Sequence, residues 1–218
     1  MPKRVDPLER RRSIAEAVFR VTADRGVEAV SVRDVAAEAG VSLGMVQHYF
    51  STKDEMLLFA LDHMRERVAG RLQARLAQLP QATPRDIILA MLTELLPTSD
   101  ESRSEAVVSV GFYSRAAVTP TYAAALRSGM QGMLDIFTQH LEAARQSGHT
   151  RPGLDTEQEA AALFWLMHGL VGPLLVGLYT PQAAQTLLDA HLDRIFRNPH
   201  PRQQPPGNDH RGHGKSGA

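Results

Sequence analysis

The sequence of 218 residues predicts an all-helical protein. Apolar residues recur at spacings of three and four along the chain, as they do on one face of a helix. The sequence contains no run of alternating β-branched residues bounded by turns, which is the pattern typical of a strand. Proline, glycine and capping residues divide the chain into about nine segments of helical length.

The first three helices are predicted from their terminal residues. The first ends at Gly26, a residue type that commonly terminates helices. The second begins at Ser31, where Asp34 completes a capping box, and ends at Gly40. A short helix follows from about Ser42. We therefore expect three helices before residue 51.

A long fourth helix and five later helices are predicted for the rest of the chain. The fourth begins at a second capping box, Ser51 with Asp54, and runs to Pro80. Thr156 and Glu159 form another box. Proline is favoured in the first turn, because its missing N–H has no partner there in any case. The five later helices are expected to begin near Pro84, Asp100, Pro120, Thr156 and Pro181.

Residues 31–50 carry the spacing of a helix-turn-helix. Ala36 is a small residue where two helices would cross closely, and Gly40 stands at the left-handed turn. Val46 is a branched apolar residue that would lock the second helix onto the first. Further inward positions are Val32, Val35, Val41 and Phe50. The pattern predicts two short helices packed across a tight turn.

The residues left on the outer face of this motif suit DNA. Gln pairs bidentately with adenine in the major groove, and Ser, His and Tyr donate to base edges or phosphates. A glycine on this face lets the backbone approach the duplex. The N-terminus of the next helix favours a phosphate through its unpaired N–H groups. The predicted DNA contacts are Arg33, Ser42, Gly44, Gln47, His48, Tyr49, Thr52 and Lys53.

A purely structural helix corner is the alternative interpretation. Such corners are common in helical bundles, and a helical protein-interaction adaptor without DNA binding could contain one. Two observations favour DNA. No acidic residue lies between Val41 and Thr52, and residues 1–53 have a mild basic excess, whereas residues 54–196 are acidic.

Residues 1–60 resemble the DNA-binding head of the TetR family of bacterial transcriptional regulators. The matching segments are "DRG" at the end of the first helix, "SVRDVAAEAGVS", "GMVQHYFSTKDEML" and the long helix beyond. Thr22 departs from the pattern, since a large apolar residue is usual there. The resemblance implies a three-helix DNA-binding head, a long linking helix, a larger helical ligand-binding domain and a homodimer formed by the last two helices.

The resemblance also implies a function and a division of the chain. Gln47 and His48 would contact bases, while Tyr49 and Lys53 would contact phosphates. The expected function is that of a ligand-responsive repressor, which binds a palindromic operator in double-stranded DNA as a dimer and is released by a small, largely apolar effector. The expected parts are the helix-turn-helix domain at 1–51, the linking helix at 52–79, the ligand-binding and dimerisation domain at 80–197 and a disordered tail at 198–218.

The C-terminal body resembles, more weakly, the regulatory domain of a subgroup that includes choline-responsive repressors. That subgroup often has Asp where this chain has His168, so a quaternary-ammonium ligand is not carried over. An effector cavity needs apolar and aromatic walls with few polar groups. The candidate contacts are Met91, Phe112, Tyr113, Met130, Met133, Phe137, Trp165 and His168. For each of them, ordinary core packing is the alternative and the commoner role.

The last two expected helices leave two alternatives open. Pro173 is expected in the middle of a helix, where it should cause a kink that shapes either a pocket or, as we favour, a dimer interface. The final helix carries an apolar stripe that belongs either to a four-helix dimer interface or to the core of its own chain. The stripe consists of Ala184, Leu187, Leu188, His191, Leu192 and Ile195.

Enzymatic activity is not expected. The sequence lacks H-E-x-x-H, G-x-S-x-G, a Gly-rich phosphate loop and acids at metal-ligand spacing. It contains no cysteine, which excludes disulfides, thiolate nucleophiles, Cys-based zinc sites and thiol sensing. We expect no cofactor and no metal site.

We expect a cytoplasmic location and no membrane partner. The basic N-terminus is not followed by the apolar stretch of a signal peptide. Residues 161–179 form an apolar run that is nearly long enough to span a bilayer, but it contains His168 and Pro173 and lacks basic flanks. A buried helix is the better interpretation of this run.

Overall fold

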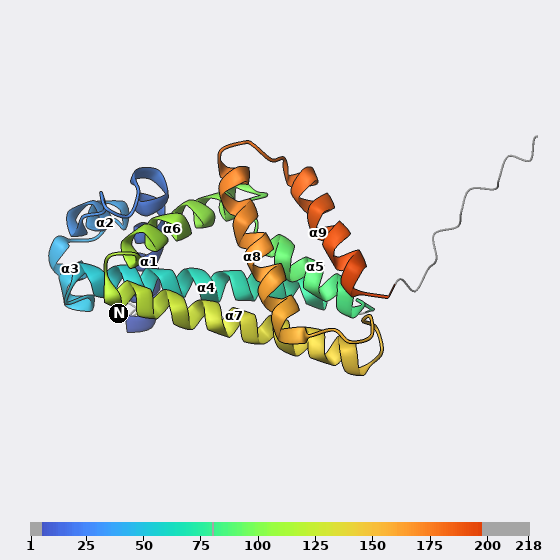
Figure 1. Cartoon of the computed structure of the whole chain (residues 1–218). Helices are drawn as coiled ribbons and strands as arrows, with labels where there is room; N and C mark the ends of the chain where they lie inside the picture. Colours follow the sequence, from blue (N-terminus) through green and yellow to red (C-terminus); the bar gives the residue numbers. More distant parts are fainter. Residues whose placement is uncertain (1–5, 80, 198–218) are drawn as a thin grey trace, which may run out of the picture.

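The computed structural model describes residues 6–79 and 81–197, and over these ranges the chain forms nine α-helices and no β-strand longer than a single bridge (Figure 1). This confirms the all-helical prediction. The predicted disordered tail, 198–218, lies outside the described residues. The helices are α1 (Pro7–Arg25), α2 (Val32–Glu38), α3 (Leu43–Tyr49), α4 (Lys53–Ala77), α5 (Pro84–Glu94), α6 (Asp100–Ala116), α7 (Pro120–Gln146), α8 (Thr156–Leu175) and α9 (Pro181–Ile195).

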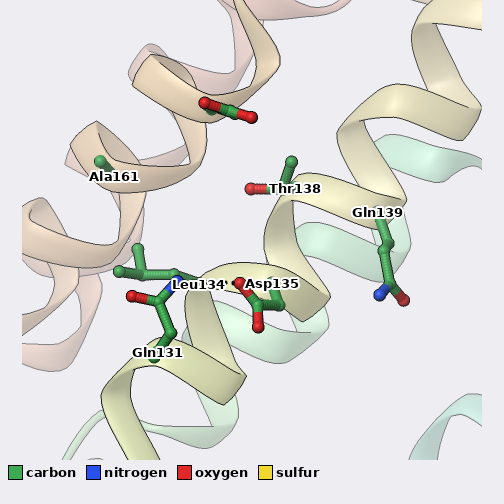
Figure 2. A pocket seen from close by; sticks show the side chains of 7 residues that line it. Gln131, Leu134, Asp135, Thr138, Gln139 and Ala161 are labelled. Atoms are coloured by element: carbon green, nitrogen blue, oxygen red, sulfur yellow. Dashed lines mark hydrogen bonds between the residues drawn. The ribbon is translucent and has the colours of Figure 1, made fainter. Parts of the chain in front are cut away.

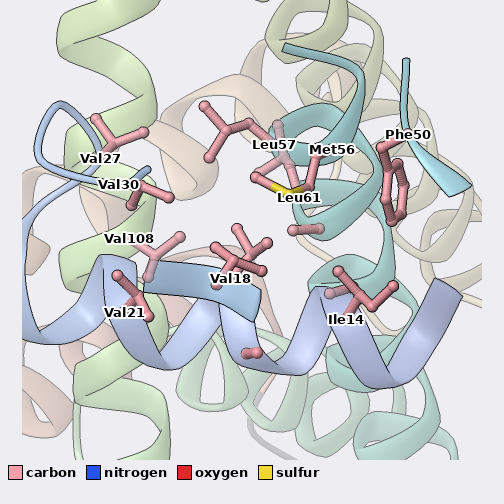
Figure 3. Packing of buried hydrophobic residues seen from close by; sticks show 14 of the residues in the cluster. Ile14, Val18, Val21, Val27, Val30, Phe50, Met56, Leu57, Leu61 and Val108 are labelled. Carbon is pink, nitrogen blue, oxygen red and sulfur yellow. The ribbon is translucent and has the colours of Figure 1, made fainter. Parts of the chain in front are cut away.

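The N-terminal helices surround a core at one end of the molecule. Figure 3 shows Ile14 and Val18 of α1 facing Leu57 and Leu61 of α4. Val108 of α6 enters the same buried cluster, so the C-terminal part of the chain helps to form the core of the N-terminal head. The head is therefore braced directly by α6 as well as by α4.

Helix α4 connects the two ends of the molecule (Figure 1). Its 25 residues correspond to a rod of about 38 Å at 1.5 Å per residue. Met56 and Met64 belong to the head cluster, whereas Leu72 packs against the second buried cluster. One continuous helix thus contributes to both cores.

The second core lies among α5, α7, α8 and α9. Phe137, Leu163 and Leu192 are fully buried in this cluster. In Figure 1, α8 crosses over α7 and α9 lies on the far side of α5 from the head. This core forms the larger helical body that the resemblance implies.

The apolar stripe of the last helix belongs to the core of its own chain. Ala184, Leu188 and Leu192 are buried, and His191 lies 2.6 Å from Glu159 of α8. Arg85 of α5 donates to the Asp189 and Asp193 carboxylates on the same helix, at 2.9 and 2.8 Å. The interpretation of this stripe as a dimer interface is wrong, because α5 and α8 of the same chain already cover it.

Two predicted capping boxes are displaced by one residue. The N-cap of α4 is Thr52, whose hydroxyl oxygen accepts from the Glu55 N–H at 3.0 Å. The Glu55 carboxylate in turn accepts from the Ser51 N–H at 2.8 Å, so the predicted pair of Ser51 and Asp54 is not the cap. At α8 the cap is Asp155, which accepts from the Gln158 N–H, rather than Thr156 with Glu159.

Pro173 lies in the last turn of α8 rather than at its middle. The helix ends at Leu175, and Gly177 follows with a left-handed φ of 75°. The Pro173 carbonyl accepts from the Leu178 N–H at 2.9 Å, which closes the turn after the helix. The Gly177 N–H also donates to the Leu174 carbonyl at 3.2 Å, so the turn at Gly177 terminates α8, and the helix passes through Pro173 to reach it.

Among the described helices, none is both long enough and apolar enough to cross a lipid bilayer. The apolar run at 161–179 instead supplies Leu163, Phe164, Met167, Leu170 and Leu174 to the second core. Burial within the protein accounts for its hydrophobicity.

Candidate nucleic-acid interface

Helices α2 and α3 form the predicted helix-turn-helix. Gly40 has a φ of +64°, a left-handed conformation that favours glycine. The Val41 N–H then donates to the Ala36 carbonyl at 3.0 Å, which closes the turn. Ala36 and Val46 are buried at the crossing of the two helices, as predicted.

The predicted DNA contacts lie on the outer side of this motif. Arg33, Ser42, Gly44, Gln47, His48 and Thr52 are exposed, while Tyr49 and Lys53 are partly buried. Gly44 has open space where a side chain would be. These residues lie in the first turn of α2, on α3 with its N-cap, and at the start of α4.

Two hydroxyl groups at this surface also cap helices. The Ser42 oxygen accepts from the Met45 N–H at 3.2 Å, and the Thr52 oxygen accepts from the Glu55 N–H at 3.0 Å. Each hydroxyl proton remains able to donate to a phosphate or base, since capping uses only a lone pair. The same residues therefore build the helix ends and present hydrogen-bond donors at them.

The partly buried contacts are held by neighbours within the head. The Tyr49 ring lies edge-on to the His48 ring, with centroids 5.1 Å apart. The Lys53 ammonium donates to the Glu28 carbonyl at 3.4 Å. These contacts position both side chains without satisfying the full donor capacity of the ammonium group.

Met45 is a surface residue of α3 that the sequence interpretation omitted. Its side chain is exposed, and it stands three residues after Ser42 and three before His48. A spacing of three residues on a helix places Met45 on the same face as Ser42 and His48. An apolar side chain there could contact a thymine methyl group in the major groove.

Arg11 fixes α1 against the start of α4. Its guanidinium donates to Glu55 at 2.9 Å and lies over the rings of Phe50 and Phe59, 4.7 and 4.6 Å from their centroids. Glu55 also holds the Ser51 N–H. The segment that joins α3 to α4 is therefore tied to α1.

The predicted effector contacts lie in different parts of the molecule, and Met130 packs against both buried clusters. Met91 and Phe137 are buried in the second core, with Met133 at its edge. Phe112 is buried in the head cluster. Tyr113 and Trp165 are exposed and His168 is partly buried, and the three rings meet at the contact of α6 with α8.

This last group forms a cluster of rings, completed by Phe164. The His168 ring lies 4.4 Å from the Phe164 ring, 5.8 Å from Tyr113 and 5.8 Å from Trp165, centroid to centroid. The Tyr113 hydroxyl contacts the Met130 sulfur at 3.5 Å. Burial lowers the pKa of His168, so the imidazole is neutral at pH 7.

Two surface hollows lie beside α7, away from these rings. One, of 440 Å³, lies between α7 and α8, and Figure 2 shows Gln131, Leu134 and Asp135 on α7 and Ala161 on α8 among the residues that line it. The other, of 570 Å³, lies along α7 alone. None of the predicted effector contacts lines either hollow.

Within the described residues, no group of three or more His, Asp or Glu side chains is arranged to hold a metal ion.

Both halves of the chain match known families. Residues 14–59 match "Bacterial regulatory proteins, tetR family", and residues 84–197 match "BetI-type transcriptional repressor, C-terminal". The chain is 35% identical over 170 residues to the HTH-type transcriptional regulator PksA of Bacillus subtilis, a match that covers 78% of this chain and 80% of PksA.

Two solved structures share the fold. A transcriptional regulator from Rhodococcus is 34% identical with a TM-score of 0.70, and the match covers 85% of this chain and 95% of that one. A transcriptional regulator from Saccharomonospora viridis, solved in complex with choline, has a TM-score of 0.76 at 24% identity. That match covers 88% of this chain and 100% of that one.

Proposed function

The chain belongs to the TetR family of transcriptional regulators, and we propose that it is a ligand-responsive repressor that binds a palindromic operator as a homodimer. A small, largely apolar effector releases it from the operator. On this proposal the protein acts in the cytoplasm, where bacterial DNA is found.

The outer face of α3 carries the proposal of operator binding. From Val41 to Thr52 this face presents polar and aromatic groups without an acid, and α4 begins directly after it with Thr52 and Lys53. A major-groove helix followed by a helix N-terminus can read bases and hold a phosphate together. Gln47 and His48 are the proposed base contacts, with Tyr49 and Lys53 on phosphates.

An exposed face of α8 supports the proposal of a dimer. Its residues share one side of the helix and leave small or apolar groups toward solvent. They are Ala162, Trp165, Gly169, Gly172 and Val176. Gly169 and Gly172 have open space around them, so a second helix can approach closely there. This face replaces the stripe of the final helix as the proposed interface.

The ring cluster of Tyr113, Phe164, Trp165 and His168 supports an effector site. It is the place where predicted effector contacts from α6 and α8 come together without being fully buried. A neutral imidazole and a tyrosine hydroxyl among aromatic rings offer a few polar contacts in an apolar setting. Met91, Phe112 and Phe137 have the packing role.

The test is selection of duplexes from random-sequence DNA by the full-length protein. The affinity of the selected duplex is then measured across a salt series for wild type and for Gln47→Ala combined with Tyr49→Ala. Salt-steep, sequence-specific binding by wild type that the double variant loses supports the repressor. Failure of the folded wild type to enrich any sequence would favour the adaptor without DNA binding.

A further inference from the structure

Asp54, in the first turn of α4, is held by two residues of the body. Its Oδ1 accepts from the Arg115 guanidinium at 2.9 Å and from the Tyr122 hydroxyl at 2.8 Å. Arg115 lies in the last turn of α6, and Tyr122 lies in the first turn of α7. The end of α4 that carries Lys53 is therefore tied to the junction of α6 and α7.

Arg115 also holds the turn between α1 and α2. Its Nη1 donates to both carboxylate oxygens of Glu28, at 3.2 and 3.0 Å. The backbone carbonyl of Glu28 accepts in turn from the Lys53 ammonium at 3.4 Å. One guanidinium thus connects two head segments that meet at the proposed phosphate contact.

The tie is seated on a rigid, buried support. The Tyr122 side chain is fully buried, and its ring centroid lies 4.8 Å from the guanidinium carbon of Arg115 and 5.8 Å from the Phe112 ring. Burial and the hydrogen bond to Asp54 raise the pKa of Tyr122 to about 12, so it remains a donor at neutral pH. Close packing continues along α6, where a Cβ on Gly111 would lie 3.1 Å from the Val27 side chain.

We propose that Arg115 and Tyr122 are positioning residues for operator binding, which hold Asp54, and with it the start of α4, so that Thr52 and Lys53 are presented to the DNA backbone. This inference rests on the proposed function.

Removing the charge of Asp54 distinguishes a positioning role from simple repulsion between its carboxylate and the DNA phosphates. A carboxylate near DNA repels the phosphates, so its neutralisation alone would tighten binding. If Asp54 is the point by which the body holds α4, its neutralisation weakens binding instead. The two explanations predict opposite signs for the same substitution.

The experiment uses the full-length protein and the duplex selected by wild type. Fluorescence anisotropy measures the Kd of Asp54→Asn and Tyr122→Phe, well below the lowest melting temperature of the set. Each is expected to bind about fivefold more weakly with unchanged base preference, since coupling residues of this kind act on that scale. Asp24→Asn is the matched control, because Asp24 is an exposed head carboxylate that pairs with Arg25 rather than with the body.

Tyr122→Phe tests whether weaker DNA binding could come from a loss of folding. It keeps the buried ring and removes only the hydroxyl that donates to Asp54. Weaker binding by both variants, with Asp24→Asn equal to wild type or tighter, supports the positioning role. Binding by Asp54→Asn and Tyr122→Phe that equals or exceeds wild type overturns it and leaves operator binding intact. If wild type selects no sequence, the proposed function itself fails.

Discussion

At the scale of single residues, the head separates side chains that build the motif from side chains that face outward. Ala36, Gly40 and Val46 form the turn and its packing, while Gln47 and Lys53 have no role in the buried core. Substitution of the outward residues should therefore change DNA binding with little effect on folding.

Gln47→Ala and Lys53→Ala should weaken operator binding in different ways. Loss of a bidentate base contact should cost about 1–3 kcal/mol and relax the preference at one base pair. Loss of a phosphate contact should weaken binding to all sequences and reduce the salt slope by about 1. Anisotropy titrations on selected and scrambled duplexes, at several salt concentrations, distinguish the two. Equal losses of specificity in both variants would contradict the assignment.

His168 should make the stability of the body depend on pH. Burial lowers its pKa in the folded protein, so the folded state disfavours the charged form. The contribution of neutral His168 to the free energy of unfolding is fully present above pH 6.5, the ordinary pKa of histidine. It is lost as the pH falls through the lowered pKa of His168 in the folded protein. Urea unfolding at pH 7.5 and 5.5 should show that the free energy of unfolding falls less between the two pH values for His168→Gln than for wild type. Burial lowers the pKa of His140 in the same way, so His140 is the other histidine to compare with His168 in this experiment.

At the scale of helices, α4 is held to its neighbours by a row of arginines. Arg67 pairs with Glu16 of α1 at 2.8 Å and with Glu101 of α6. One turn further, Arg71 pairs with Glu94 of α5 at 2.8 Å and with Glu105 of α6 at 2.6 Å. These pairs tie the linking helix to α1, α5 and α6.

Arg71→Ala should destabilise the fold by about 3 kcal/mol, because it leaves the buried Glu105 carboxylate without its partner. Arg75→Ala is the control, since Arg75 is more exposed and lies 3.8 Å from Glu94, and exposed pairs contribute about 0–1 kcal/mol. Chemical denaturation of the two variants provides the measurement. A similar cost for both would show that Glu105 does not depend on Arg71.

At the scale of the whole molecule, the two cores share helices α4 and α7. The head core includes Val108 and Phe112 of α6 together with Tyr122 and Leu126 of α7. A change of shape in the body can reach the head through α4 and α7, because these two helices pack in both cores. This connection gives an effector a physical means of altering the orientation of α3.

Val176→Glu should break the proposed dimer without affecting the fold of the protomer. Val176 is 79% exposed at the end of α8, so a charge there costs little in the single chain but is buried unpaired in the interface. Light scattering after size exclusion should show monomers, and operator affinity should fall. Val118→Glu, at an 83% exposed valine after α6, is the matched control and should leave the assembly unchanged. A variant that stays dimeric would exclude this face.

Much of the architecture could be predicted from local patterns. The positions of α1 to α3 follow from capping residues and glycines a few positions apart, and so does the outer face that contains Gln47 and His48. The caps of α4 and α8 lie one residue from the predicted Ser51 and Thr156, because Thr52 and Asp155 are equally good capping residues. Local pattern alone does not decide between adjacent hydroxyl and carboxylate side chains.

The sequence by itself determined the helical class, the helix-turn-helix and the residues on its outer face, because helix periodicity and turn chemistry depend on near neighbours. Only the tertiary structure decided that the stripe of α9 faces its own core and that Phe112 belongs to the head. It also brought Asp54 to Arg115 and Tyr122 across 61 and 68 residues. Such contacts depend on how whole helices pack, and no local spacing records which partner each helix face meets.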